Sequence, residues 1–319
     1  MEGRSAIKGT LYLLLTVLGI PGNLTIISSF VHIAQHDRRL HPADKIVGNL
    51  ALVNLAVVLV RCVPETTAAF GLEQLFDDNG CKIVIFIYRT TRSLSIWLTF
   101  LLSGFQGITL APSTPKWSIA KRLAPRCLPG ALALLWLLNM CLSTSAILFS
   151  ISSGNNSTRK KFAVNLEYCL VKFPSRAVKI AIGALQTSRD VIPIALMILA
   201  SAYILLILYK HHQQVKGLRS SSKGQRSSAE TRAAKAVLTL VTLYVLFFGI
   251  DNIMWVYTLT VAETMQTSVT SDIRVFFSSL YASVSPIVII ASNKKIQNKM
   301  KCTKAKPEME ASETVPSHN

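Results

Sequence analysis

The sequence predicts an all-α membrane protein, built as a bundle of seven transmembrane helices. The chain has 319 residues, of which 50% are hydrophobic and only 16% charged, and its mean hydropathy is +0.42. These values are too apolar for an ordinary soluble domain of this size. Seven apolar runs, each long enough to cross a bilayer as about 20 residues of helix, alternate with polar segments. Lys and Arg are concentrated in every second polar segment, which is typical of a multi-pass membrane protein.

The first span is the run LYLLLTVLGIPGNLTIISSFVHI. A signal peptide is the competing interpretation, but the apolar part is too long for one and no small-residue cleavage site follows it. We therefore expect a helix that stays in the membrane, with Gly19, Pro21 and Gly22 tolerated because neighbouring helices repair the backbone. The seven predicted spans cover approximately residues 7–33, 46–64, 82–111, 127–151, 187–209, 236–261 and 273–291.

The third span carries charged residues among its apolar ones. At 3.6 residues per turn, one stripe of this helix contains Arg89, Arg92, Ile96, Thr99, Ser103 and Gln106. A charged side chain at mid-bilayer costs at least about 2.5–3.5 kcal/mol, so the stripe should face protein or water, and the span should lie in the middle of the bundle. Two interpretations of the stripe stay open. It holds helices together, with its arginines near the outer interface, or it lines a ligand cavity.

The basic residues predict the orientation of the bundle. Lys and Arg are frequent after spans one, three and five and in the tail, so these segments should be cytoplasmic and the N-terminus extracellular. Arg159, Lys160 and Lys161, after span four, are a local exception that the other segments outweigh. Residues 212–231 are then a basic, serine-rich cytoplasmic loop, and residues 292–319 a cytoplasmic tail.

The predicted extracellular side contains candidate modification sites. Asn155 and Asn156 begin two overlapping glycosylation sequons in a long loop predicted from 152 to about 186. Cys81 and Cys169 also fall on this side, where disulfides persist. From the residues alone they are either bridged or two free thiols.

Residues of spans two, three, five, six and seven predict a ligand site, with Arg61, Arg89 and Arg92 in the outer halves of their spans. The candidates are Arg61, Arg89, Arg92, Ile96, Thr99, Arg189, Asp190, Asp251, Trp255, Ser278 and Tyr281. The arginine surplus favours an anionic or acceptor-rich ligand, because a guanidinium group binds a carboxylate or sulfate at two points. The alternative is that Asp190 or Asp251 pairs internally with an arginine and leaves no charge for a ligand.

Several functional classes are disfavoured. The net charge of +18 would suggest nucleic-acid binding in a soluble protein, but here the charges lie between apolar runs. The sequence shows no phosphate-binding glycine loop, zinc spacing or nucleophile elbow, and none of its six cysteines forms a CxxC pair. We therefore predict no enzyme activity, no metal site, no cofactor and no nucleic-acid partner. A transporter would be expected to contain paired halves, and no internal repeat is visible.

Several motifs resemble one receptor family over nearly the whole chain. They are Leu40-His41-Pro42-Ala43-Asp44 before GNLALVN, Arg61-Cys62-Val63-Pro64, Leu94-Ser95-Ile96 before LLSGFQGITLAP, ALLWLLNM, Ser188-Arg189-Asp190-Val191, YKHHQQVKGLRSSS and Ser285-Pro286-Ile287. The chain resembles the vomeronasal type-1 receptors, which are G-protein-coupled receptors, and equally their fish members, the olfactory receptors related to class A. It shares with them Ile108 to Pro112 where most rhodopsin-like receptors have an Asp-Arg-Tyr triplet, and Asn54 where these usually have a sodium-binding Asp.

The resemblance implies a function and a location. Such a receptor lies in the plasma membrane as a multi-pass protein, detects a small chemosignal and activates a Gi-type G protein. The Cys81–Cys169 arrangement matches a very common receptor layout, which favours a bridge. The expected G-protein surface has basic residues that can meet either an acidic partner or anionic membrane lipid: Lys210, Lys216, Arg219, Arg232 and Lys235. The remaining alternatives are a non-chemosensory seven-helix receptor and a membrane transporter.

Overall fold

The computed structural model of the chain describes residues 2–37, 40–71, 75–112, 114–152, 163–166, 169–217, 224–261 and 267–298. Its helices and strands are α1 (Glu2–Asp37), α2 (Pro42–Val57), the π-helical segment η1 (Val58–Cys62), α3 (Val63–Ala69), α4 (Asp78–Leu110), α5 (Pro115–Ser143), α6 (Ser145–Phe149), β1 (Ser150–Ser152), β2 (Ala163–Leu166), β3 (Cys169–Lys172), α7 (Arg176–Gly217), α8 (Gly224–Val261) and α9 (Thr267–Ser292). Seven candidate membrane spans, long and apolar enough to cross a bilayer, occur in this described part, which confirms the predicted seven-helix bundle.

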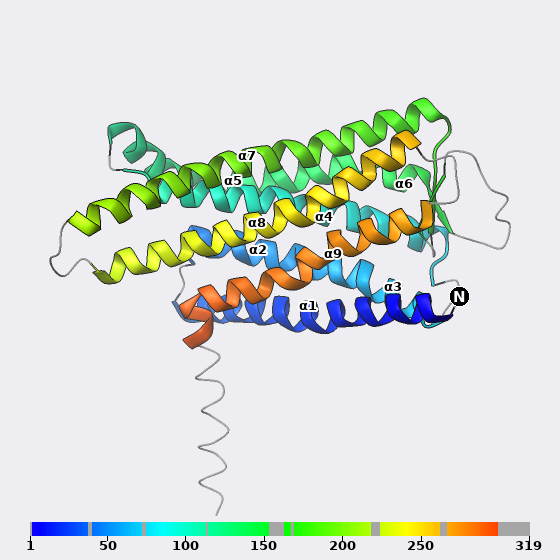
Figure 1. Ribbon diagram of the computed structural model, residues 1–319, viewed down its shortest axis with the longest axis horizontal. Helices are drawn as coiled ribbons and strands as arrows, with labels where there is room; N and C mark the ends of the chain where they lie inside the picture. Colours follow the sequence, from blue (N-terminus) through cyan, green and yellow to red (C-terminus); the bar gives the residue numbers. More distant parts are fainter. Residues whose placement is uncertain are drawn as a thin grey trace, which may run out of the picture.

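The helices lie side by side along the long axis of the bundle (Figure 1). The three strands gather at the end where α1 begins, and we call this the sheet end. The consecutive helices α7 and α8 extend furthest at the other end, near the C-terminal end of α9, and we call this the opposite end (Figure 1).

Most helices run beyond the predicted spans. Helix α1 covers Glu2–Asp37 where 7–33 was expected, and α7 begins at Arg176 where 187 was expected. The predicted 212–231 loop also differs from the structure, because α7 continues to Gly217 and α8 begins at Gly224. Hydropathy marks only the apolar part of a helix, whereas Lys, Arg, Gln and Ala are good helix formers outside the membrane as well.

The second span is not one regular helix. Its α-helical start, α2, passes into the π-helical segment η1 and then into the short helix α3. A π-helical turn holds an additional residue, and such turns are frequent at functional sites. Arg61 lies in this turn and is only 2% exposed, so a charged residue near the end of the predicted span is turned into the protein.

A small sheet covers the start of α4. The strand order is β1-β3-β2 and both pairs are antiparallel, with Ser152 opposite Cys169. The structure contains the expected disulfide between Cys81 at the start of α4 and Cys169 in β3, with 5.7 Å between their Cα atoms. The segment from 152 to about 186 was predicted as a loop. Its described part contains the strands β2 and β3 and the first turns of α7.

Helix α4 lies at the centre of the bundle. It packs against α2, α5, α7 and α8, as its polar stripe predicted. The main core cluster joins buried residues of all these helices, among them Leu50, Leu94, Leu128, Met197 and Tyr244. Most of the exposed large hydrophobic residues of α5 and α7 are leucine, isoleucine and valine, which suits helices that face lipid on one side.

Helices α1 and α9 approach closely at two glycines. A Cβ atom at Gly22 would lie 2.8 Å from the Cβ of Pro286, and one at Gly19 would lie 2.9 Å from the hydroxyl of Ser283. Small residues allow this kind of contact between membrane helices, where close packing is a main source of stability. The contact aligns α9, which carries several of the predicted site residues, against the rest of the bundle.

Candidate functional site

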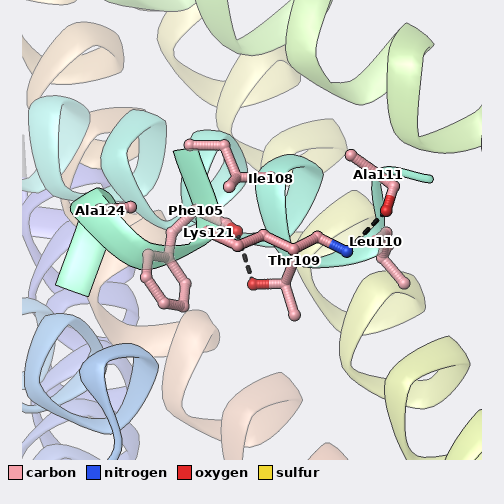
Figure 2. Close-up of a pocket in the computed structure, with 7 residues that line it drawn as sticks. All are labelled: Phe105, Ile108, Thr109, Leu110, Ala111, Lys121 and Ala124. Carbon is pink, nitrogen blue, oxygen red and sulfur yellow. Dashed lines mark hydrogen bonds between the residues drawn. The ribbon is translucent and has the colours of Figure 1, made fainter. Parts of the chain in front are cut away.

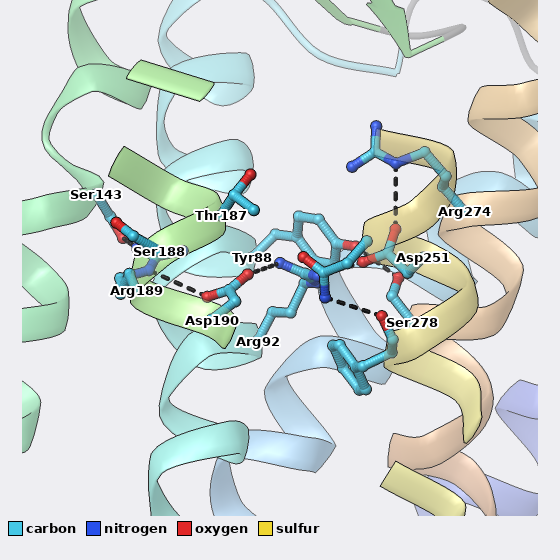
Figure 3. Close-up of polar contacts among 12 residues, drawn as sticks. Tyr88, Arg92, Ser143, Thr187, Ser188, Arg189, Asp190, Asp251, Arg274 and Ser278 are labelled. Atoms are coloured by element: carbon cyan, nitrogen blue, oxygen red, sulfur yellow. Dashed lines mark hydrogen bonds and ion pairs between the residues drawn. The ribbon is translucent and has the colours of Figure 1, made fainter. Parts of the chain in front are cut away.

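Arg92 lies at the centre of an ion network (Figure 3). It belongs to the half of α4 that is nearer to the sheet end. Its position is about 16 Å along α4 from Cys81, at about 1.5 Å per residue. Its Nη1 donates to Oδ2 of Asp190 on α7 at 2.6 Å, and its Nη2 donates to Asp251 on α8. The Asp190 and Asp251 side chains are each 3% exposed. The guanidinium also lies 4.9 Å from the centre of the Phe248 ring. One side chain of α4 therefore holds α7 and α8 together.

Two further arginines complete the network. Arg189 donates from Nε to Asp190 at 3.2 Å and from Nη1 to the Ser143 hydroxyl at 3.3 Å. Arg274, near the start of α9, donates from Nε to Asp251 at 3.2 Å. Each carboxylate is thus shared by two arginines, and the network connects α4, α5, α7, α8 and α9. Such geometry compensates the cost of burying charge, which for a single ion is several kcal/mol.

Among the described residues, the network region carries more positive than negative charge. Its described cations are Arg92, Arg189 and Arg274, and its described anions are Asp190 and Asp251, which gives a net charge of +1. Arg89, one turn before Arg92, raises this to +2. It donates to the Ser145 hydroxyl at 3.4 Å, and no carboxylate of the described residues lies within ion-pair distance of it. Arg89 is therefore the arginine of this region that no described carboxylate neutralises.

A second cluster of charged residues lies between α1, η1, α3 and α9. Lys8 is 2.9 Å from Glu65 and 3.0 Å from Asp272, and Arg61 is 3.2 Å from Glu65. The Arg61 guanidinium also stacks 5.2 Å from the centre of the Tyr88 ring. Each of these cations thus has at least one carboxylate partner among the described residues. The predicted ligand residue Arg61 belongs to this cluster.

A chain of neutral polar groups continues deeper into the bundle. Asn54 donates to Ser285 at 3.0 Å and accepts from Ser95 at 2.7 Å, and the hydroxyls of Thr99 and Tyr281 lie 3.0 Å apart. The rings of Tyr244 and Phe248 stack at 4.1 Å, and Tyr244 meets Tyr281 edge-on at 4.3 Å. Helices α4, α8 and α9 are thus joined at two levels, by the ion network and, deeper in the bundle, by hydroxyls and rings, and α2 joins them at the deeper level through Asn54.

The structure brings most of the predicted site residues together. Arg92, Asp190 and Asp251 are in direct contact, and Ile96, Thr99, Ser278 and Tyr281 are buried next to them on α4 and α9. Trp255 lies in α8, but its side chain is outside the described residues, as are Asn155 and Asn156. Among the described residues, no group of three or more His, Cys, Asp or Glu side chains is arranged to hold a metal ion.

Two network residues were missed in the sequence. Ser278, Tyr281 and Ser285 share one face of a helix by their spacing, and Arg274 continues that face one turn before Ser278, so this periodicity would have found it. Tyr88 lies one turn before Arg92, and its hydroxyl is 2.7 Å from that of Ser278. Both continue stripes that the sequence already showed, whereas Ser143 and Ser145, the hydroxyl partners of Arg189 and Arg89, carry no comparable signal.

Four of the five expected G-protein residues belong to described helices at the opposite end. Lys210 and Lys216 belong to the extension of α7, and Arg232 and Lys235 to the first turns of α8. Lys210 and Lys235 are exposed, the side chain of Lys216 is outside the described residues, and so is all of Arg219. This end also contains a hollow of about 400 Å³ between α4 and α5 (Figure 2). It is far along α4 from the ion network, so it is not the predicted ligand site.

Seven helices able to span a membrane, a disulfide from the start of α4 to the sheet, and buried ions inside the bundle are the features expected of a seven-transmembrane receptor. Comparison with known proteins agrees with this class. The chain matches the vomeronasal organ pheromone receptor family over residues 5–302 and belongs to that family. It is therefore a G-protein-coupled receptor, a multi-pass protein of the plasma membrane and not an enzyme.

Individual relatives come from fish and mammals. The chain is 43% identical to Olfactory receptor class A-like protein 1 of Danio rerio over 306 residues, which cover 96% of this chain and 95% of the relative. It is 32% identical to Vomeronasal type-1 receptor 1 of Gorilla gorilla gorilla over 91% of this chain and 81% of the relative. It is 31% identical to Vomeronasal type-1 receptor 45 of Mus musculus over 93% and 92%. These matches confirm the resemblance seen in the motifs.

Proposed function

We propose that this chemosensory receptor binds a small molecule among its helices and in response activates a Gi-type G protein. The observation that carries the proposal is the ion network, in which Arg92 connects Asp190 on α7 with Asp251 on α8. The basic residues expected to face the G protein also lie on α7 and α8, at the opposite end of the bundle. A ligand that alters the network therefore acts on the same helices that would meet the G protein.

The proposed ligand carries an acid group. Arg92 is occupied by two carboxylates, so we assign the first contact with the ligand to Arg89, whose described partner is a serine hydroxyl at 3.4 Å. The surplus of two positive charges around it would be reduced by one carboxylate or sulfate. A planar guanidinium binds such a group at two points and orients it. The buried rings of Tyr244, Phe248 and Tyr281 supply the apolar surroundings that small-molecule sites commonly have.

The proposed mechanism is a shift between two states of the bundle. A ligand that binds one state more tightly increases its population, and no other energy source is required. An acid near Arg89 and Arg92 competes with Asp190 and Asp251 for the guanidinium groups. It therefore favours a state in which the ion pairs that connect α7 and α8 to α4 are weakened. The positive-inside pattern supports an extracellular sheet end and a cytoplasmic opposite end, where Lys210, Arg232 and Lys235 would lie next to the G protein.

The experiment is a signalling assay on receptor expressed at the cell surface, read as a fall in stimulated cAMP that pertussis toxin abolishes. The test compounds are matched acids, amides and amines. We expect acids to be active, and Arg89→Met to reduce their potency about 10- to 100-fold, the value of one hydrogen bond to a charged group.

The matched variant Arg89→Lys keeps the charge but loses the two-point geometry, so its potency should lie between those of the native receptor and Arg89→Met. A response to amides or amines that Arg89→Met leaves unchanged, at equal surface level, would refute the acid-binding site. A response that pertussis toxin does not affect would refute the Gi coupling alone.

A further inference from the structure

The hollow at the opposite end is formed by the last turns of α4 and the first turns of α5. It has a volume of about 400 Å³, and Figure 2 shows Lys121 of α5 extending across it. Its lining residues are Phe105, Ile108, Thr109, Leu110, Ala111, Lys121 and Ala124. None of them belongs to the ion network or to the neutral polar chain, so the proposed function does not use this hollow.

Lys121 supplies the charge of this lining. Its Nζ donates to the carbonyl oxygen of Ala111 at 2.7 Å, just after the end of α4. A lysine ammonium has three N–H donors, so two remain after this bond. The Thr109 hydroxyl donates to the Phe105 carbonyl at 2.9 Å. No carboxylate of the described residues is within ion-pair distance of Lys121, and the hollow therefore presents hydrogen-bond donors and positive charge beside apolar side chains.

The surrounding surface of α5 has the same character. Lys116, Arg122 and Arg126 are exposed, and the sequence contains no Asp or Glu between Asp78 and Glu167. Between these cations, Ile119 and Leu123 are 68% and 54% exposed. Exposed aliphatic side chains among basic ones are typical of a helix segment at the boundary between headgroups and acyl chains. An acidic protein surface would pair with the cations but would offer no apolar contacts to Ile119 and Leu123.

We propose that this hollow and the first turns of α5 bind the headgroup of an anionic phospholipid. Its phosphate accepts hydrogen bonds from Lys121, and its acyl chain runs along Ile119 and Leu123 towards the membrane-spanning part of α5. This inference rests on the proposed orientation, in which the opposite end meets the cytoplasmic leaflet, where phosphatidylserine is concentrated. Because Lys121 also holds the Ala111 carbonyl, the lipid would be bound directly at the end of α4.

The test uses purified receptor reconstituted in nanodiscs of mixed phosphatidylserine and phosphatidylcholine. Native mass spectrometry then measures which lipids stay bound to the receptor after it is released from the nanodisc. The native protein should retain phosphatidylserine preferentially. Lys121→Gln should reduce this preference about fivefold, since a basic residue near an anionic surface contributes about 1 kcal/mol. Lys121→Arg should keep it, which separates loss of charge from a folding defect.

The matched control is Lys45→Gln, which removes one exposed positive charge at the same end, near the start of α2. It should reduce the preference less than Lys121→Gln, because Lys45 does not line the hollow. Equal retention of both lipids by the native protein, or equal losses in Lys121→Gln and Lys45→Gln, would overturn the proposal. Neither ligand nor G protein is present in this measurement, so a negative result leaves the proposed signalling function untouched, and a failed signalling assay leaves the lipid site untouched.

Discussion

At the residue scale, Arg89 and Arg92 differ in their partners although both lie on the same stripe of α4. Arg92 binds two buried carboxylates, and Arg89 binds a serine hydroxyl. Breaking a buried ion pair is costly because the remaining charge loses its compensation. In this network, however, Arg189 and Arg274 still contact the two carboxylates when Arg92 is removed. The two α4 arginines should therefore have separable roles, one structural and one in ligand binding.

The first prediction tests the structural role. Arg92→Met should lower the free energy of unfolding by about 1.5–3 kcal/mol or more. This range is the contribution of one hydrogen bond to a charged group, and Arg92 makes two. Its surface expression should fall accordingly. The measurement is thermal unfolding of the purified receptor together with surface staining of expressing cells.

The same substitution at Arg89 is the control for Arg92, because it removes an identical side chain one turn away that no carboxylate neutralises. Arg89→Met should unfold close to the native temperature. If both variants lost the same stability, the ion network would not be the reason for the effect of Arg92→Met.

At the element scale, the contact between α1 and α9 depends on the absence of side chains. A Cβ at Gly22 would lie 2.8 Å from the Cβ of Pro286, and neither atom can turn away, because both are fixed to the backbone. The helices would have to separate. Since α9 carries Arg274, Ser278 and Tyr281, a shift of α9 would also move its part of the site.

We therefore predict that Gly22→Ala destabilises the receptor by about 1–3 kcal/mol, the usual cost of overpacking. The readout is again the unfolding temperature in detergent. Gly130→Ala in α5 is the matched control, since nothing lies within 4 Å of a Cβ built there. It should be neutral or slightly stabilising, because alanine is the better helix former. Equal effects of the two substitutions would argue against the close α1–α9 contact.

At the scale of the whole molecule, charges outside the membrane predict the orientation of the bundle. The basic segments after spans one, three and five favour the cytoplasm for the opposite end. The sheet end contains the Cys81–Cys169 disulfide, which is the type of bond that persists outside the cell. These two features are independent, and they support the same orientation.

The orientation can be tested with terminal epitope tags and glycosidase. An N-terminal tag should be stained on intact cells, and a C-terminal tag only after permeabilisation. The double variant Asn155→Gln with Asn156→Gln should migrate faster in gels and become insensitive to glycosidase. Reversed staining of the tags would refute the orientation, while unchanged migration would refute only the glycosylation of these asparagines.

The sequence by itself determined the number of spans, the central place of α4, the candidate cysteine pair and the family. These properties are local or additive, because hydropathy, helical periodicity and motifs can be read from neighbouring residues. The helix ends were predicted less well, since hydropathy stops at the membrane while helix propensity does not. The π-helical turn at Arg61 left no recognisable pattern.

Only the tertiary structure decided which charges meet. Arg92 lies 98 residues from Asp190 and 159 residues from Asp251 in the sequence. Their contact depends on the relative depth and rotation of α4, α7 and α8, which are fixed by packing across the whole core. The sequence placed Arg89 and Arg92 on one stripe and could not distinguish them. The fold neutralises Arg92 and, among the described residues, leaves Arg89 without a carboxylate partner, because both Asp190 and Asp251 reach the bundle interior at the level of Arg92.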